Sequence, residues 1–274
     1  MSVIQFTPKR AKLPTAPLPQ PPAHQAAAVG GTMGIDLSGK AKCWFFIGRG
    51  RIGKTTLARY LSETVTAAGG EALVAAVDPV NRSLRSFIDG VVEPPSADPA
   101  EVKAWLQQLL EFIVENRHSA LIDLGGGDTS LIALLQDMPD LAGVMSAGGV
   151  EPVAIYMAGT DPHDLTPMAA AEAAGFNPRA AAIVLNEAHG RRHSDDFDRV
   201  TDHPAFQQVI DWGAIQLWMP LLTPDAARVI DANTWHYLTA KNHLGPFYAS
   251  ALHQWLRRMR EDIGEPIGTW FPGR

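Results

Sequence analysis

Short apolar runs alternate with longer amphipathic stretches from Cys43 onward. This alternation is typical of βα units, in which helices join parallel strands. The apolar runs predict strands at Cys43–Ile47, Ala72–Val77, Ser119–Ile122, Val153–Met157, Ala181–Leu185 and Ile215–Trp218. The amphipathic stretches predict helices at Lys54–Ala68, Pro99–Asn116, Leu165–Ala174, Phe206–Asp211 and Phe247–Glu261. We therefore expect an α/β fold with a mostly parallel central sheet and helices on both faces.

Composition divides the chain into three parts. Residues 1–40 are rich in proline and show neither a period of two nor one of 3.6, which predicts a disordered arm. Its basic residues Lys9, Arg10 and Lys12 suit either a solvated tail or a weak tether to a partner. Residues 41–262 are expected to form one folded domain, and 263–274 a C-terminal tail broken by proline and glycine.

Charge and cysteine usage exclude several classes of protein. The formal net charge of −6 argues against nonspecific nucleic-acid binding by the whole chain, although a local basic patch stays open. No membrane span or secretory signal is visible, so we expect a cytoplasmic protein with no integral membrane association. The single cysteine, Cys43, leaves no internal disulfide, and the scattered histidines show no metal-ligand spacing.

A phosphate-binding loop is predicted directly after the first strand. Gly48, Gly53, Lys54 and Thr55 fit the G-x-x-x-x-G-K-[ST] pattern, between an apolar strand and a helix. Glycines at such a loop let backbone N–H groups surround phosphates, and the helix N-terminus adds its positive dipole end. Lys54 would supply a charge to the outer phosphates and Thr55 a hydroxyl to Mg²⁺. This makes 41–262 a P-loop nucleotide-binding domain.

The loop resembles that of the ParA/MinD group of deviant Walker ATPases, which reads K-G-G-x-G-K-T-T. The resemblance implies nucleotide contacts from Gly48, Gly50, Gly53, Lys54, Thr55 and Thr56. Arg49 stands where the family has its signature lysine, and Arg51 replaces the family's second glycine. The family lysine reaches the nucleotide of the partner subunit, so the resemblance implies a catalytic role for Arg49 beside Lys54, and a nucleotide-dependent homodimer.

Two aspartates follow in the family's order. Asp78, in the segment Val77-Asp78-Pro79, resembles the carboxylate that positions the attacking water near Mg²⁺. The alternative is that Asp78 only caps the following turn. Asp123, before three consecutive glycines, resembles the Walker B aspartate that holds Mg²⁺ together with Thr55. The implied metal site is therefore Thr55, Asp123 and Asp78, and the implied cofactors are ATP and Mg²⁺.

The later part of the chain resembles the family less closely. Asn186, after the fifth strand, resembles the asparagine that hydrogen-bonds the purine base, and the alternative is a turn asparagine. Pro220 resembles the proline that helps to enclose the base. The stretch Gly190–Asp211 matches no family feature and is a candidate specificity insert. The helix Phe247–Glu261 is expected to dock on the core through Phe247, Leu252, Trp255, Leu256 and Met259, although its arginines could face nucleic acid.

Three functions remain open. The leading one is a switch ATPase that dimerises with ATP, positions or segregates a cargo such as plasmid DNA in partition or conjugative transfer, and resets by slow hydrolysis. DNA or a DNA-bound adaptor protein would be its partner. The second is an ATP-dependent ligase or small-molecule kinase on the same fold, with Gly190–Asp211 as its substrate pocket. The third is a nucleotide-dependent adaptor that does not hydrolyse. We take ATP as the default nucleotide, because no N-K-x-D guanine signature is visible in the sequence.

Overall fold

The central element is a six-stranded sheet in which every strand pairing is parallel. The computed structural model describes residues 35–78, 84–127 and 129–271. The strand order is β2-β3-β1-β4-β5-β6. The strands are β1 Ala41–Ile47, β2 Leu73–Ala76, β3 Ala120–Asp123, β4 Val150–Ala158, β5 Ala180–Asn186 and β6 Ile215–Met219. The predicted α/β class is confirmed, and all six predicted strands are present.

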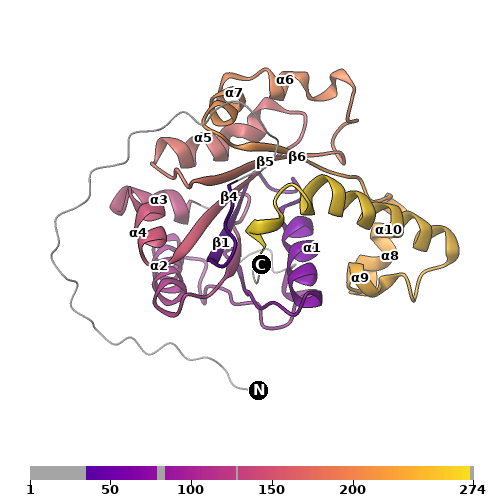
Figure 1. Cartoon of the computed structure of the whole chain (residues 1–274), viewed down its shortest axis with the longest axis horizontal. Helices are drawn as coiled ribbons and strands as arrows, with labels where there is room; N and C mark the ends of the chain where they lie inside the picture. Colours follow the sequence, from indigo (N-terminus) through magenta and orange to yellow (C-terminus); the bar gives the residue numbers. More distant parts are fainter. Residues whose placement is uncertain (1–34, 79–83, 128, 272–274) are drawn as a thin grey trace.

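Helices cover both faces of this sheet (Figure 1). The α-helices are α1 Lys54–Ala67, α2 Pro99–Asn116, α3 Ser130–Asp137, α4 Leu141–Ala147, α5 Thr166–Ala173, α6 Asp198–Thr201, α7 Pro204–Asp211, α8 Pro224–Ala232, α9 Tyr237–Ala240 and α10 Pro246–Met259. Shorter turns are η1 Leu84–Ser86, η2 Pro162–Leu165, η3 Asp195–Phe197, η4 Arg260–Gly264 and η5 Gly268–Trp270. One core lies between the sheet and α1, α8, α9 and α10, and the other beneath α2 to α7.

Local sequence explains why these elements begin and end where they do. β1 reads Ala-Lys-Cys-Trp-Phe-Phe-Ile, nearly all buried, as expected of a central parallel strand covered on both faces. α2 begins at Pro99 because the Asp98 carboxylate accepts hydrogen bonds from the backbone N–H groups of Ala100 and Glu101. It ends where Arg117 takes a left-handed conformation at φ 51°. The sequence did not predict α3, α4, α6, α8 and α9, each of which is at most nine residues long.

The packed part of the chain is wider than the predicted limits of 41–262. Leu37, inside the predicted arm, is buried in the core, whereas residues 1–34 lie outside the described residues. Ile263, Ile267 and Trp270, inside the predicted tail, are also buried. The Trp270 indole N–H donates to the carbonyl oxygen of Ile35 at 2.7 Å. Proline and glycine in 263–271 therefore shape a segment that packs on the sheet.

α10 docks on the core, but one of the residues predicted to face it does not. Leu252, Trp255 and Met259 are buried, whereas Phe247 is 89% exposed. Phe247 lies in the first turn of α10, beyond the part that covers the sheet. Within the described residues, no helix is both long enough and apolar enough to cross a bilayer.

A buried arginine ties the helix after the phosphate loop to the α8–α9 region. The Arg59 guanidinium lies between the rings of Phe87 and Tyr237, with its carbon 3.8 and 3.9 Å from their centroids. It also donates to Glu63 at 3.2 Å and to Asp231 at 2.9 Å. The buried charge is thus matched by two carboxylates and two aromatic faces. This contact fixes α8 and α9 against α1.

Candidate functional site

The predicted phosphate loop connects β1 to α1 at the carboxyl edge of the sheet. Gly53 has φ 105°, and a Cβ there would lie 2.6 Å from the Asn186 side-chain nitrogen. A Cβ on Gly48 would lie 2.9 Å from the carbonyl oxygen of Met157. Both positions therefore require glycine because neighbouring atoms leave no room for a Cβ. Gly53 is required also because its positive φ favours glycine. Arg51, at the family's second glycine, adopts φ 63°.

The side chains of Lys54 and Thr56 point in different directions. Lys54 is buried, and its Nζ donates to the carbonyl oxygens of Gly48 and Arg49, each at 2.8 Å. The ammonium group is thus held inside the curve of the loop. Thr56 instead hydrogen-bonds the phenol of Tyr237 on α9, which points its hydroxyl toward the helical layer. Gly50 is exposed at the tip of the loop.

Thr55 and Asp123 are brought together as predicted. The Thr55 hydroxyl donates to Asp123 Oδ2 at 2.7 Å, because β3 lies next to β1 and both strands end at this edge. Asp123 Oδ1 is buried and has no hydrogen-bond partner among the described residues. Burial raises the pKa of Asp123 to about 6, the Thr55 hydrogen bond and the Lys54 charge oppose this, and the charge of Asp78 adds to it.

This pair fits a magnesium ion. Mg²⁺ prefers oxygen ligands and is commonly held by one or two carboxylates together with substrate phosphates. The orphaned Oδ1 of Asp123 and the Thr55 hydroxyl are such oxygens. When bound, the ion would neutralise charge that develops on the phosphates. No cluster of three or more metal-ligating His, Cys, Asp or Glu side chains occurs in the described part of the chain.

The glycines after Asp123 bring two further segments against the site. A Cβ on Gly125 would lie 3.0 Å from Asp78 Cβ, so Asp78 sits directly against this loop. A Cβ on Gly126 would lie 2.2 Å from the backbone nitrogen of Gly50. The loop after β3 therefore rests on the tip of the phosphate loop. Pro79 and Val80, part of the predicted motif around Asp78, lie outside the described residues.

The Arg49 side chain reaches the segment after β4, whereas Asp78 and Asp123 lie at the ends of β2 and β3 on the other side of β1 in the strand order. Its guanidinium Nη1 is 3.3 Å from Asp164 Oδ1 and 3.5 Å from Asp161 Oδ2, both on the segment after β4. Asp164 is buried and also accepts from the backbone N–H of Gly159 at 3.0 Å. The Arg49 side chain remains 48% exposed. In this structure Arg49 is thus paired within its own chain, and its catalytic role stays a prediction.

Asn186 supports the phosphate loop from below. Its side-chain N–H donates to the carbonyl oxygen of Ile52 at 2.9 Å, and its Oδ1 accepts from the backbone N–H of Ala188 at 2.9 Å. Asn186 is also buried. Its contacts combine a turn role with a loop-positioning role, and contact with a purine base stays a prediction. The Pro220 carbonyl oxygen accepts from the Trp255 indole N–H at 2.8 Å.

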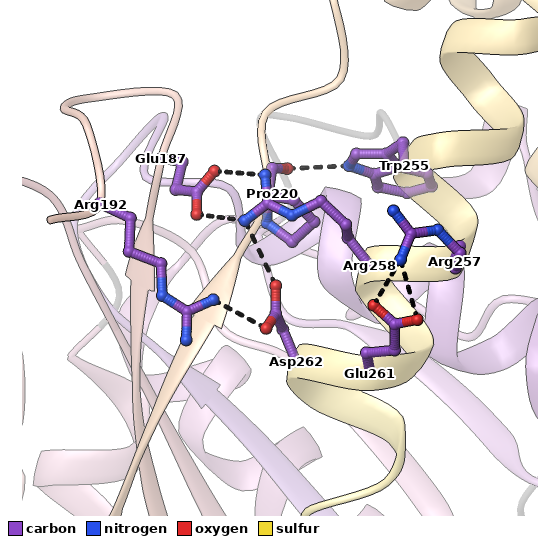
Figure 2. A network of polar contacts seen from close by, with 8 residues as sticks. All are labelled: Glu187, Arg192, Pro220, Trp255, Arg257, Arg258, Glu261 and Asp262. Atoms are coloured by element: carbon purple, nitrogen blue, oxygen red, sulfur yellow. Dashed lines mark hydrogen bonds and ion pairs between the residues drawn. The ribbon is translucent and has the colours of Figure 1, made fainter.

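The arginines near the end of α10 face carboxylates (Figure 2). Arg258 binds both oxygens of Glu187, which follows β5, and also lies 3.3 Å from Asp262. Arg257 contacts Glu261 at 3.0 Å. These ion pairs neutralise part of the positive charge of the α10 arginines, which the sequence analysis considered for contact with nucleic acid.

Sequence reasoning missed two parts of the site. Asp161 and Asp164 surround His163 in the sequence, and the pairing with Arg49 depends on β4 lying beside β1. The three glycines after Asp123 were noted only as a run, whereas in the structure Gly126 makes close backbone contact with Gly50. The sequence offered two signals, the aspartates at 161 and 164 and the three consecutive glycines. Neither signal specifies which residue it will contact in the fold.

Comparison with known proteins adds no family assignment, since neither the protein-family models nor the curated proteins give a match for this chain.

Proposed function

We propose that this chain is an ATP-binding, slowly hydrolysing switch ATPase of the ParA/MinD kind, acting in the cytoplasm. In this proposal it dimerises with ATP, and the dimer positions or segregates a cargo such as plasmid DNA, directly or through a DNA-bound adaptor protein. The observation that carries the proposal is the Thr55–Asp123 hydrogen bond beside Lys54 in a glycine-bounded loop. That set matches the chemistry of Mg²⁺–triphosphate binding.

Each site residue has a distinct part in the proposal. Lys54 would release the loop carbonyls and turn to the outer phosphates, while backbone N–H groups of the loop bind phosphate oxygens. Thr55 and Asp123 would hold Mg²⁺, and Asp78 would orient the attacking water. Arg49 would have to leave Asp161 and Asp164 before it could reach a partner subunit, so dimerisation competes with this pair.

The test measures ATP binding and Mg²⁺-dependent turnover together with the molecular size of the protein. We expect Lys54→Ala to lower ATP affinity by at least about a hundredfold, because the ammonium group proposed to contact the outer phosphates is lost. Lys241→Ala is the matched control, since Lys241 is exposed on the surface and distant in sequence from the loop. Undiminished ATP affinity in Lys54→Ala would refute the nucleotide assignment.

A second candidate function is an ATP-dependent small-molecule ligase or kinase. It is favoured by a pocket of about 520 Å³ whose lining includes Gly190–His193, from the stretch that matches no family feature. ATP turnover that requires a small-molecule acceptor would favour this candidate over the switch.

A further inference from the structure

A polar pocket opens at the carboxyl edge of the sheet, beyond the ends of β5 and β6. It has a volume of about 520 Å³ and is lined by Gly190–His193, Glu187, Leu221 and Arg258. Glu187 directly follows β5, and its backbone N–H donates to the carbonyl oxygen of Met219 at the end of β6. Ligands of open α/β sheets bind at this edge.

The segment Gly190–His193, which lines one side of this pocket, is held by several close contacts. The backbone N–H of Arg191 donates to Asp196 Oδ2 at 2.7 Å, and the Ser194 hydroxyl donates to the carbonyl oxygen of Arg191 at 2.7 Å. A Cβ on Gly190 would lie 2.6 Å from the Thr160 methyl carbon, so this turn is closely packed. His193 adopts φ 67°. A rigid backbone of this kind presents its side chains with little entropic cost on binding.

A network of ion pairs holds the pocket residues Glu187, Arg192 and Arg258 in place (Figure 2). Arg258 contacts Glu187 at 2.8 and 2.5 Å, and Asp262 links Arg258 at 3.3 Å to Arg192 at 2.7 Å. The Arg192 guanidinium also lies over the Trp218 ring, 5.2 Å from its centroid. These contacts join β5, β6 and α10 around the pocket.

The side chains that line the pocket include more arginines than carboxylates. Arg191, Arg192 and Arg258 line the pocket together with one carboxylate, Glu187, while Asp262 and Asp196 lie beside Arg192 and Arg191 from outside the lining. No described side chain forms an ion pair with Arg191. His193 adds a further donor, and Leu221, which is 48% exposed, adds an apolar wall.

We propose that this pocket binds a small molecule that carries a phosphate monoester, with the phosphate at Arg191 and His193 and the remainder against Leu221. Arginine presents several N–H donors in a planar fork that matches phosphate oxygens. The pocket volume is sufficient for a sugar phosphate. Binding there does not depend on what the phosphate loop binds.

The surroundings of the pocket favour a small anion over a nucleic acid. The segment immediately after His193 carries four exposed aspartates, Asp195, Asp196, Asp198 and Asp202. A long polyanion laid across the pocket would approach these carboxylates, and like charges repel. A compact phosphate ester covers a smaller area and approaches fewer of these carboxylates.

The test uses full-length protein with Lys54→Ala as background, so that phosphate binding at the loop is removed. Calorimetric titration would compare inorganic phosphate, ribose 5-phosphate and unphosphorylated ribose. We expect ribose 5-phosphate to bind and ribose not to bind. Adding Arg191→Gln and His193→Gln together should lower the affinity for ribose 5-phosphate at least tenfold. Arg228→Gln is the matched control, because Arg228 is a well-exposed arginine on α8.

Four results would overturn the proposal. The first two are that ribose 5-phosphate does not bind, or that ribose binds equally well. The third is that the Arg191/His193 double variant keeps its affinity for ribose 5-phosphate. The fourth is that this double variant loses binding to duplex DNA, which would assign the pocket to a nucleic acid. In wild-type protein, saturating ATP should leave the affinity for ribose 5-phosphate within about twofold; competition would instead assign the pocket to the nucleotide of the loop. Failure of wild type to bind ATP would contradict only the proposed ATPase function.

Discussion

Gly126 is the residue at which two loops of the candidate site come closest. Its missing side chain allows the loop after β3 to lie on the backbone of Gly50, where a Cβ would be 2.2 Å from the nitrogen. Backbone atoms at that distance cannot be relieved by a rotamer change, so a side chain at 126 must displace one of the loops. A Cβ on the neighbouring Gly127 would have no described atom within 4 Å.

Gly126→Ala is therefore expected to weaken ATP binding by at least about tenfold, or ~1.4 kcal/mol, because it shifts the phosphate loop. Gly127→Ala, the matched control, should stay within about twofold of wild type, since it adds the same methyl group in open space. Titration with a fluorescent ATP analogue measures both. Equal affinities for the two variants would show that the contact with Gly50 does not influence the nucleotide site.

At the scale of elements, one partly buried polar pair joins β4 to α5. The Tyr156 hydroxyl donates to Glu172 Oε1 at 2.9 Å, while Glu172 Oε2 is buried without a hydrogen-bond partner among the described residues. Burial raises the pKa of Glu172, and the Tyr156 hydrogen bond partly opposes this. A buried acceptor without a partner costs free energy when it carries charge.

The sign of the resulting pH dependence follows from proton linkage. With its pKa raised in the folded state, Glu172 keeps its proton at pH values where the unfolded chain has lost it. The free energy of unfolding therefore falls as pH rises from the ordinary glutamate pKa through the raised one. Glu172→Gln removes this loss and keeps an acceptor for Tyr156.

We expect Glu172→Gln to raise the melting temperature at neutral pH and to flatten its pH dependence just above the ordinary glutamate pKa. Thermal unfolding between pH 4 and 8 measures both effects. Glu115→Gln, at an exposed position on α2, should leave the profile unchanged. A lower melting temperature for Glu172→Gln at neutral pH would mean that the ionised carboxylate stabilises the fold.

At the scale of the whole molecule, the two ends of the described chain meet against the central strand. The Trp44 indole N–H on β1 donates to the carbonyl oxygen of Trp270 at 2.9 Å, and the buried Lys42 ammonium donates to that of Phe271 at 3.1 Å. Burial lowers the pKa of Lys42. Trp270 in turn donates to Ile35. The segment 263–271 thus completes the core on the α1 face.

Trp270→Ala should destabilise the protein by about 3–5 kcal/mol, because it removes a fully buried aromatic side chain and a hydrogen bond. Trp212→Ala is the control: Trp212 is 56% exposed, and a change of less than about 0.5 kcal/mol is expected. Urea unfolding measures the difference. A Trp270→Ala variant as stable as the Trp212→Ala variant would contradict a core role for the C-terminal segment.

The sequence alone determined the elements whose signal is local. Six apolar runs predicted six strands because a parallel strand covered on both faces must be apolar along its length. The glycine spacing from Gly48 to Thr55 predicted a loop between strand and helix because each residue there meets a backbone requirement within the motif. That Thr55 and Asp123 lie together was also predicted, although only through the resemblance to a known family, and their role as Mg²⁺ ligands stays a prediction.

Tertiary structure decided every feature that depends on which segments become neighbours. Arg49 pairs with Asp161 and Asp164 because β4 lies next to β1. No local sequence pattern predicts which strands become neighbours. Asn186 holds the phosphate loop because β5 ends beneath it. The segment 263–271, irregular and broken by proline and glycine, has no periodicity that would predict burial. It is buried because the sheet offers it an uncovered apolar surface, and the burial of that surface depends on the assembled fold.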